Sequence, residues 1–152
     1  MFDIAFLLDE PLHHAEAGTP GAWGRTCLGL DFEEHFIAPL DRWTRADDER
    51  QWVEAGRRLM DGGERTAFVL EAGWLWWTAW RDAERVIVQQ RLLVEDRMAS
   101  AWVAPPSSVP YDLVGARETH NEDGVPLSEW QMSMADVRAF VERRARLSGT
   151  AG

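Results

Sequence analysis

Apolar and aromatic residues are most concentrated between Gly73 and Leu93, where four of the nine tryptophans lie. One charged segment, Arg81 to Arg85, divides this stretch into two runs rich in aromatic and β-branched residues. Such runs on either side of a short polar break are typical of two antiparallel strands joined by a turn. Because tryptophans would point to both faces of the first strand, we predict a hairpin in the middle of a sheet that is covered on both sides.

Gln89 and Gln90 interrupt the second strand of this hairpin. A glutamine in a covered strand must find hydrogen-bond partners, because burying an unpaired amide costs free energy. The pair therefore predicts either a position at a sheet edge or the lining of a polar pocket.

Three further segments have the pattern of strands. Met1 to Leu8 is apolar enough for a first strand. Arg65 to Ala72 predicts a strand that turns at Ala72-Gly73 into the tryptophan-rich hairpin. Between Asp112 and Ser133, a turn signal at Asn121 to Gly124 separates two strand-like runs and predicts a second hairpin.

Helical spacing of apolar residues predicts three helices, over residues 31–38, 44–61 and 134–147. The first would begin at the cap Asp31 and end before Pro39, because proline disfavours helical geometry in the preceding residue. Four residues would form its apolar side: Phe32, Phe36, Ile37 and Leu40.

The second predicted helix opens with a capping pattern, in which Thr44 precedes Asp47 by three residues. Its first turn would carry Asp47, Asp48 and Glu49, where carboxylates complement the positive end of the helix dipole. The same three acids form a concentrated negative feature that a basic partner could use.

The remaining segments predict loops. Residues 9–30 contain six glycines and prolines, which indicates a loop-rich excursion. Residues 148–152 are expected to fray. Consecutive strands joined by short turns favour an α+β fold in one domain over residues 1–152, with a mainly antiparallel sheet of about five to six strands and two to three packed helices.

Composition is that of a globular protein, with 45 % hydrophobic and 28 % charged residues in 152. No apolar run approaches the roughly 18 residues of a membrane span, and Met1 to Asp9 lacks the pattern of a secretory signal. The single cysteine, Cys27, excludes an internal disulfide. We therefore expect a cytoplasmic protein without a membrane partner.

The net charge is −10, and all sixteen basic residues are arginine. An acidic surface repels phosphate backbones, so we expect no nucleic-acid partner. The same charge would steer a basic protein towards this chain. An acidic composition that serves solubility alone remains the alternative at this point.

Sequence motifs for catalysis, metal binding and cofactor binding are absent: there is no phosphate-binding loop, dinucleotide-binding loop, G-x-S-x-G or H-E-x-x-H. His13 and His14 lack matching carboxylate or cysteine ligands, so an exposed pair is favoured over a metal site. Adjacent acids such as Glu122 and Asp123 do not form a catalytic pair, which needs two environments across a cleft. We therefore predict neither an enzyme nor a cofactor.

Several positions carry a resemblance to a known family. The most specific are Gln51-Trp52 in the second predicted helix and Ser128-Glu129-Trp130 before the last one. The others are Phe36, Leu40, Trp43, Asp47 to Arg50, Leu59, Gly62, Trp76-Trp77, Val86 to Leu93, Glu122 to Gly124 and Val137 to Phe140. This pattern, between Asp31 and Val141, resembles the immunity proteins of bacterial contact-dependent growth inhibition systems. It departs from the family in having Asp48 where an aromatic residue is common.

The resemblance implies a small cytoplasmic α+β domain that is not an enzyme. Such a domain binds one cognate toxin domain and blocks its active site; the toxins of similar proteins include ribonucleases, which tend to be basic. The acids of this chain would then compete for the cationic groups of the toxin. Two clusters are predicted as the partner-binding residues: Asp47, Asp48 and Glu49, together with Glu118, Glu122 and Asp123.

Two other readings remain open from the sequence. One is a small-ligand-binding protein or enzyme with a pocket near Gln89, Gln90 and the tryptophan-rich strand. The other is a structural or adaptor module, which would differ from an immunity protein only in its partner.

Overall fold

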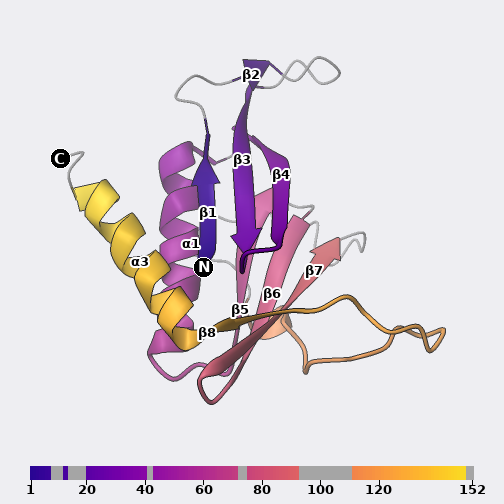
Figure 1. Cartoon of the computed structure of the whole chain (residues 1–152). Coiled ribbons are helices and arrows are strands. Elements are labelled where there is room, and N and C mark those ends of the chain that lie inside the picture. Colours follow the sequence, from indigo (N-terminus) through magenta and orange to yellow (C-terminus); the bar gives the residue numbers. More distant parts are fainter. Residues whose placement is uncertain (8–11, 14–19, 41–42, 72–74, 93–110, 150–152) are drawn as a thin grey trace.

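The chain folds into two antiparallel sheets and two α-helices (Figure 1). The computed structural model describes residues 1–7, 12–13, 20–40, 43–71, 75–92 and 111–149. The predicted α+β class and antiparallel pairing are confirmed. The predicted single sheet of five to six strands is wrong, because the described residues form two sheets of four strands each.

Strand β3 (Pro20–Leu28) is the centre of the first sheet and pairs with the other three strands. These are β1 (Phe2–Phe6), β2 (Leu12–His13) and β4 (Phe32–Pro39). The predicted loop over residues 9–30 is therefore wrong for the part that forms β3. Tight packing explains the glycine at position 24, since a Cβ there would lie 2.2 Å from Cζ of Phe36.

The predicted helix over residues 31–38 is also wrong, because this segment is strand β4. Phe32, Phe36 and Ala38 share the inward face of the strand, and Phe36 and Ala38 are buried. The spacing of four residues between Phe32 and Phe36 fits one side of a helix as well as one face of a strand, whereas the spacing of two between Phe36 and Ala38 fits only the strand. Full pairing with β3, from Leu28–Phe32 to Gly21–Pro39, decides the conformation.

The second sheet has the order β5-β6-β7-β8, and its first three strands are the predicted meander. They are β5 (Arg65–Glu71), β6 (Leu75–Asp82) and β7 (Arg85–Leu92). The turn between β6 and β7 uses Ala83 at φ 55°. The predicted turn at Ala72-Gly73 lies outside the described residues.

The predicted hairpin between Asp112 and Ser133 is only partly confirmed. After the 3-10 turn Tyr111–Leu113, residues 115–129 form a projecting two-limbed loop, here called the arm (Figure 1). Its turn is at the predicted place, where the Gly124 amide donates to the Asn121 carbonyl at 3.0 Å and Gly124 has φ 75°. The strand that follows, β8 (Trp130–Ser133), pairs with β7 instead of the outgoing limb.

Helices α1 (Arg45–Met60) and α3 (Met134–Gly149) pack against each other beside the sheets (Figure 1). The predicted capping box of α1 is confirmed: the Asp47 amide donates to Thr44 Oγ1 at 3.2 Å, and the Thr44 amide donates to Asp47 Oδ2 at 2.9 Å. Gly56 permits a close approach of the helices, since a Cβ there would lie 2.5 Å from Cγ2 of Val141.

The side chain of Gln51 closes the outer edge of β5. Its Nε2 donates to the Ala67 carbonyl at 2.8 Å, and its Oε1 accepts from the Val69 amide at 2.9 Å. These are the two bonds that a neighbouring strand would make, so the amide of Gln51 takes the place of a strand at this edge. Nε2 also donates to the hydroxyl of Tyr111 at 3.1 Å.

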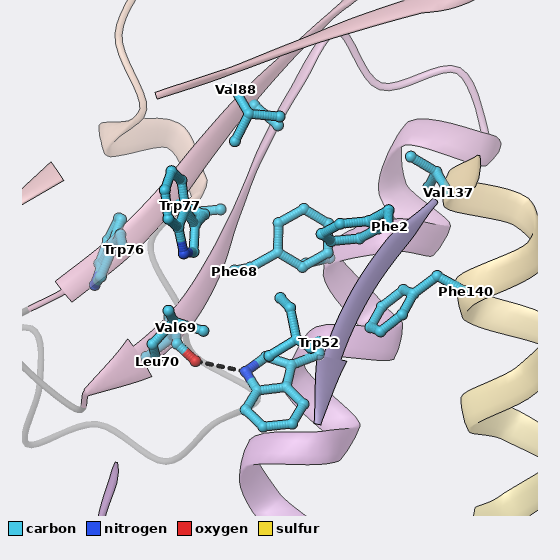
Figure 2. Close-up of a cluster of buried hydrophobic side chains, with 14 of the residues drawn as sticks. Phe2, Trp52, Phe68, Val69, Leu70, Trp76, Trp77, Val88, Val137 and Phe140 are labelled. Atoms are coloured by element: carbon cyan, nitrogen blue, oxygen red, sulfur yellow. Dashed lines mark hydrogen bonds between the residues drawn. The ribbon is translucent and has the colours of Figure 1, made fainter. Parts of the chain in front are cut away.

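Aromatic side chains fill the space between the sheets and α1 (Figure 2). The ring of Phe2 lies 5.1 Å from that of Phe68 and 4.7 Å from that of Phe140. Trp52 also donates its indole N–H to the Val69 carbonyl at 2.6 Å (Figure 2). The prediction that most tryptophans are core residues is confirmed for Trp52, Trp76 and Trp77, and Trp130 is partly buried against them.

Candidate interaction surface

The arm places three of the predicted partner-binding acids at the surface. Glu118, Glu122 and Asp123 are all exposed, and none of them forms an ion pair with another described residue. The arm extends away from the sheets in Figure 1, with the Asn121 to Gly124 turn at its far end. These carboxylates are thus free to meet a partner.

Hydrogen bonds within the arm hold its tip in a defined shape. The Asn121 side-chain oxygen accepts from the amides of Asp123 at 3.0 Å and Val125 at 2.9 Å. Backbone bonds join Asn121 to Val125 at 2.9 Å and Leu127 to Thr119 at 2.9 Å across the two limbs. A partner therefore meets charges that are already positioned, which lowers the entropic cost of binding.

The base of the arm is fastened by a bidentate ion pair. Arg117 donates from Nε and Nη2 to the two carboxylate oxygens of Glu129, each at 2.6 Å. The guanidinium of Arg117 holds the pKa of Glu129 below its usual value. Glu129 is therefore already neutralised within the chain, in contrast to Glu118, Glu122 and Asp123.

A groove of about 510 Å³ separates the outer face of the second sheet from the arm. Gln89 and Gln90 line it, so the predicted polar pocket near the tryptophan-rich strand is present. Gln89 is 9 % exposed, and its Nε2 donates to the Glu118 carbonyl at 2.7 Å and to Glu129 Oε2 at 2.9 Å. Gln90 is exposed and donates to Glu34 of β4 at 2.5 Å.

Other groove residues were not selected from the sequence, namely Trp80, Arg91 and Asn121. For Trp80 and Arg91, the sequence pattern does indicate a position on the same face as Gln89. The short turn at Ala83 pairs Trp80 with Ile87, so strand alternation places Gln89 and Arg91 on the same face as Trp80.

The acids at the start of α1, namely Asp47, Asp48 and Glu49, do not lie beside the arm. Figure 1 shows α1 beginning at the top of the molecule, next to the end of α3, whereas the arm lies at the lower right. Glu49 lines a separate depression with Arg50 and Arg144. Asp47 is held by its capping bonds and by Arg50, whose Nη2 lies 2.7 Å from Asp47 Oδ1. The backbone amide of Thr44 chiefly keeps the pKa of Asp47 low.

Asp48, which was predicted as a partner-binding residue, lies in the interior. Asp48 is only 1 % exposed, and its Oδ2 has no hydrogen-bond partner among the described residues. Burial, reinforced by the charges of Asp47 and Glu49, raises its pKa to about 8. The spacing could have revealed this, because Asp48 lies four residues before the buried Trp52, on the same side of α1.

Histidine, cysteine and acidic side chains are the candidates for metal binding or nucleophilic chemistry. No group of three or more histidine, cysteine or acidic side chains is placed there to hold a metal ion. His14 lies outside the described residues. Cys27 is buried, which raises the pKa of its thiol and disfavours a nucleophilic role. None of the described helices is long and apolar enough to cross a bilayer.

Comparison with known proteins agrees with this architecture. The family model described as the CdiI N-terminal domain matches residues 38–140. Among solved structures, a chain of the "CdiA-CT/CdiI toxin and immunity complex from Enterobacter cloacae" is similar, with a TM-score of 0.76 and 22 % sequence identity. The likeness covers 96 % of this chain and 99 % of that one. No match was found among curated proteins.

Proposed function

Because this chain belongs to the CdiI N-terminal domain family, we propose that it is an immunity protein that binds and neutralises a cognate toxin domain. The likeness to a chain of a toxin and immunity complex supports a fold suited to this role. Under this proposal the chain is an inhibitor without catalysis of its own, and its partner is a protein.

The exposed carboxylates of the arm carry the proposal for how the toxin is bound. Glu118, Glu122 and Asp123 form no ion pair with a described residue and project from the body on a loop that is braced by hydrogen bonds. A toxin that handles RNA gathers cationic groups around its active site. The arm would occupy those groups in place of phosphates and so block the active site of a basic ribonuclease.

The helix-start acids contribute less under this proposal. Asp48 is buried, Asp47 is used by the helix cap, and Glu49 lies at the other end of the molecule from the arm. One toxin domain would engage the arm, and the helix start would remain outside the contact.

Growth rescue tests the proposed function directly. The toxin domain encoded beside this gene is expressed from an inducible promoter in cells that do or do not produce this chain. We expect growth to continue only with the chain present, and the purified chain to form a complex with that domain. Loss of growth despite equal levels of correctly folded chain would contradict the proposal. An unrelated toxin domain, which should still kill, is the control for specificity.

A ligand-binding protein or enzyme is the second candidate, because the groove beside the tryptophan-rich strand exists. Active sites usually combine a cavity with a buried ionisable group of perturbed pKa. The ionisable residues that line this groove, Arg91, Glu118 and Glu122, are all exposed. The arrangement therefore favours recognition of a partner over catalysis.

A further inference from the structure

The groove beneath the arm presents an acceptor that the fold itself leaves unused. Both groups that face the Gln89 amide, the Glu118 carbonyl and the Glu129 carboxylate, are acceptors, so the nitrogen must point towards them. The side-chain oxygen of Gln89 then receives no hydrogen bond from any described residue. Gln89 lines the groove, so this oxygen can accept a hydrogen bond from a donor that enters there.

Two carboxylates and an indole complete the surroundings of this oxygen. Glu118 and Glu122 line the same groove, and neither forms an ion pair with a described residue. Trp80 is held in place because its Nε1 donates to the Gly115 carbonyl at 2.9 Å. Trp80 lines the groove, and indole faces attract cations, guanidinium groups especially.

We propose that this groove binds one arginine side chain. Its guanidinium donates to the carboxylates of Glu118 and Glu122 and to the side-chain oxygen of Gln89, and stacks on Trp80. A planar group with five donors can reach several acceptors at once, whereas the ammonium of lysine offers three donors around one point. The inference rests on the proposed function in one respect, that the arginine is supplied by the toxin domain.

Arg91 gives the proposal a distinctive consequence. It lines the groove, is exposed and forms no ion pair with a described residue. Its charge repels an incoming guanidinium. Removing that charge should strengthen binding, which a merely structural role for Arg91 does not predict.

The test uses the full chain, labelled with nitrogen-15, and the peptide Ac-Gly-Arg-Gly-NH2 followed by NMR. We expect saturable shifts of the Trp80 indole signal. Binding should be at least tenfold weaker with citrulline in place of arginine, and several-fold weaker with lysine. The double variant Glu118→Gln/Glu122→Gln should lose about tenfold in affinity, and Arg91→Gln should gain about two- to threefold. Glu142→Gln, which removes an exposed acid of α3, is the matched control and should change nothing.

Equal binding of the citrulline peptide, or affinity that does not respond to Glu118→Gln/Glu122→Gln, would overturn the site. The peptide experiment contains no toxin domain, so its outcome does not depend on the growth-rescue experiment. The arginine site and the immunity function can therefore be contradicted independently. A chain that rescues growth but does not discriminate arginine from citrulline keeps its function and loses this site. A chain that binds the arginine peptide but gives no rescue keeps the site and loses the toxin as its partner.

Discussion

Asp48 is an ionisable side chain whose surroundings disfavour its charged form. It lies on the buried side of α1, one turn before Trp52, with its carboxyl among groups that do not hydrogen-bond to Oδ2. Taking a carboxylate out of water favours the protonated form, which is why the pKa rises to about 8. The side chain therefore takes up a proton when the chain folds.

This uptake makes the free energy of unfolding depend on pH. The contribution of Asp48 is fully present below its unfolded pKa of 3.8 and is lost as the pH rises through about 8. Asp48→Asn cannot ionise, so we expect it to be more stable than the parent, with a difference that grows from pH 4 to pH 8 and reaches about 1–3 kcal/mol. Urea unfolding at several pH values measures this difference. Glu142→Gln, at an exposed position, should show no such trend, and an Asp48→Asn variant that is less stable at pH 8 would contradict the burial argument.

At the level of the element, a side chain of α1 hydrogen-bonds to the outer edge of β5 in place of a neighbouring strand. Gln51 is fully buried and satisfies a carbonyl and an amide that otherwise face no strand. Gln51-Trp52 is one of the two most specific parts of the family resemblance, and the structure gives a physical reason for it. Both side chains bond to the backbone of β5.

Replacing Gln51 with leucine should remove this closure while preserving side-chain volume. The Ala67 carbonyl and the Val69 amide would remain buried without partners, which should cost about 2–4 kcal/mol of unfolding free energy. Chemical denaturation measures the loss, and Gln131→Leu on the exposed side of β8 should stay within about 0.5 kcal/mol of the parent. A Gln51→Leu variant as stable as the parent would show that the edge is satisfied in another way.

The elements also differ in whether the sequence pattern is enough to predict them. Capping at Thr44, the β5-β6-β7 meander and the turn at Asn121 could be predicted, because each depends on neighbouring residues. Strand β4 could not, because its apolar spacing fits two conformations and only pairing with β3 selects one. The same limit applies to the site. The exposure of Glu118, Glu122 and Asp123 near a turn follows from the local sequence, but the separation of the helix start from the arm depends on how distant segments pack.

Across the whole molecule, the acidic residues that give the net charge of −10 have different roles. Many acids cap helices or form internal ion pairs, as Asp47 does with Arg50 and Glu129 with Arg117. The acids of the arm form no ion pair with a described residue, so under the proposed function their effect should appear in the rate of encounter with the toxin domain.

Reversing the charges at Glu118, Glu122 and Asp123 to lysine should slow association with the toxin domain about tenfold or more at low salt. The difference should narrow as salt screens the field. Surface plasmon resonance with an inactive toxin domain gives both rates. The same charge reversal at Glu49 and Glu142, away from the arm, should leave association within about threefold. Equal rates for the arm variant and this control would remove the arm as the docking surface.

The way the arm is fastened has a consequence for how such a protein can diversify. Its anchoring contacts, Arg117 with Glu129 and Gln89 with the Glu118 carbonyl, lie at the base, and the tip is shaped by its own backbone and by Asn121. Side chains from Thr119 to Val125 are exposed and contribute nothing to the aromatic core. Most can therefore mutate with little penalty in folding. A lineage could change which toxin it tolerates through a few substitutions at the tip, while selection for a foldable chain acts on the base and the sheets.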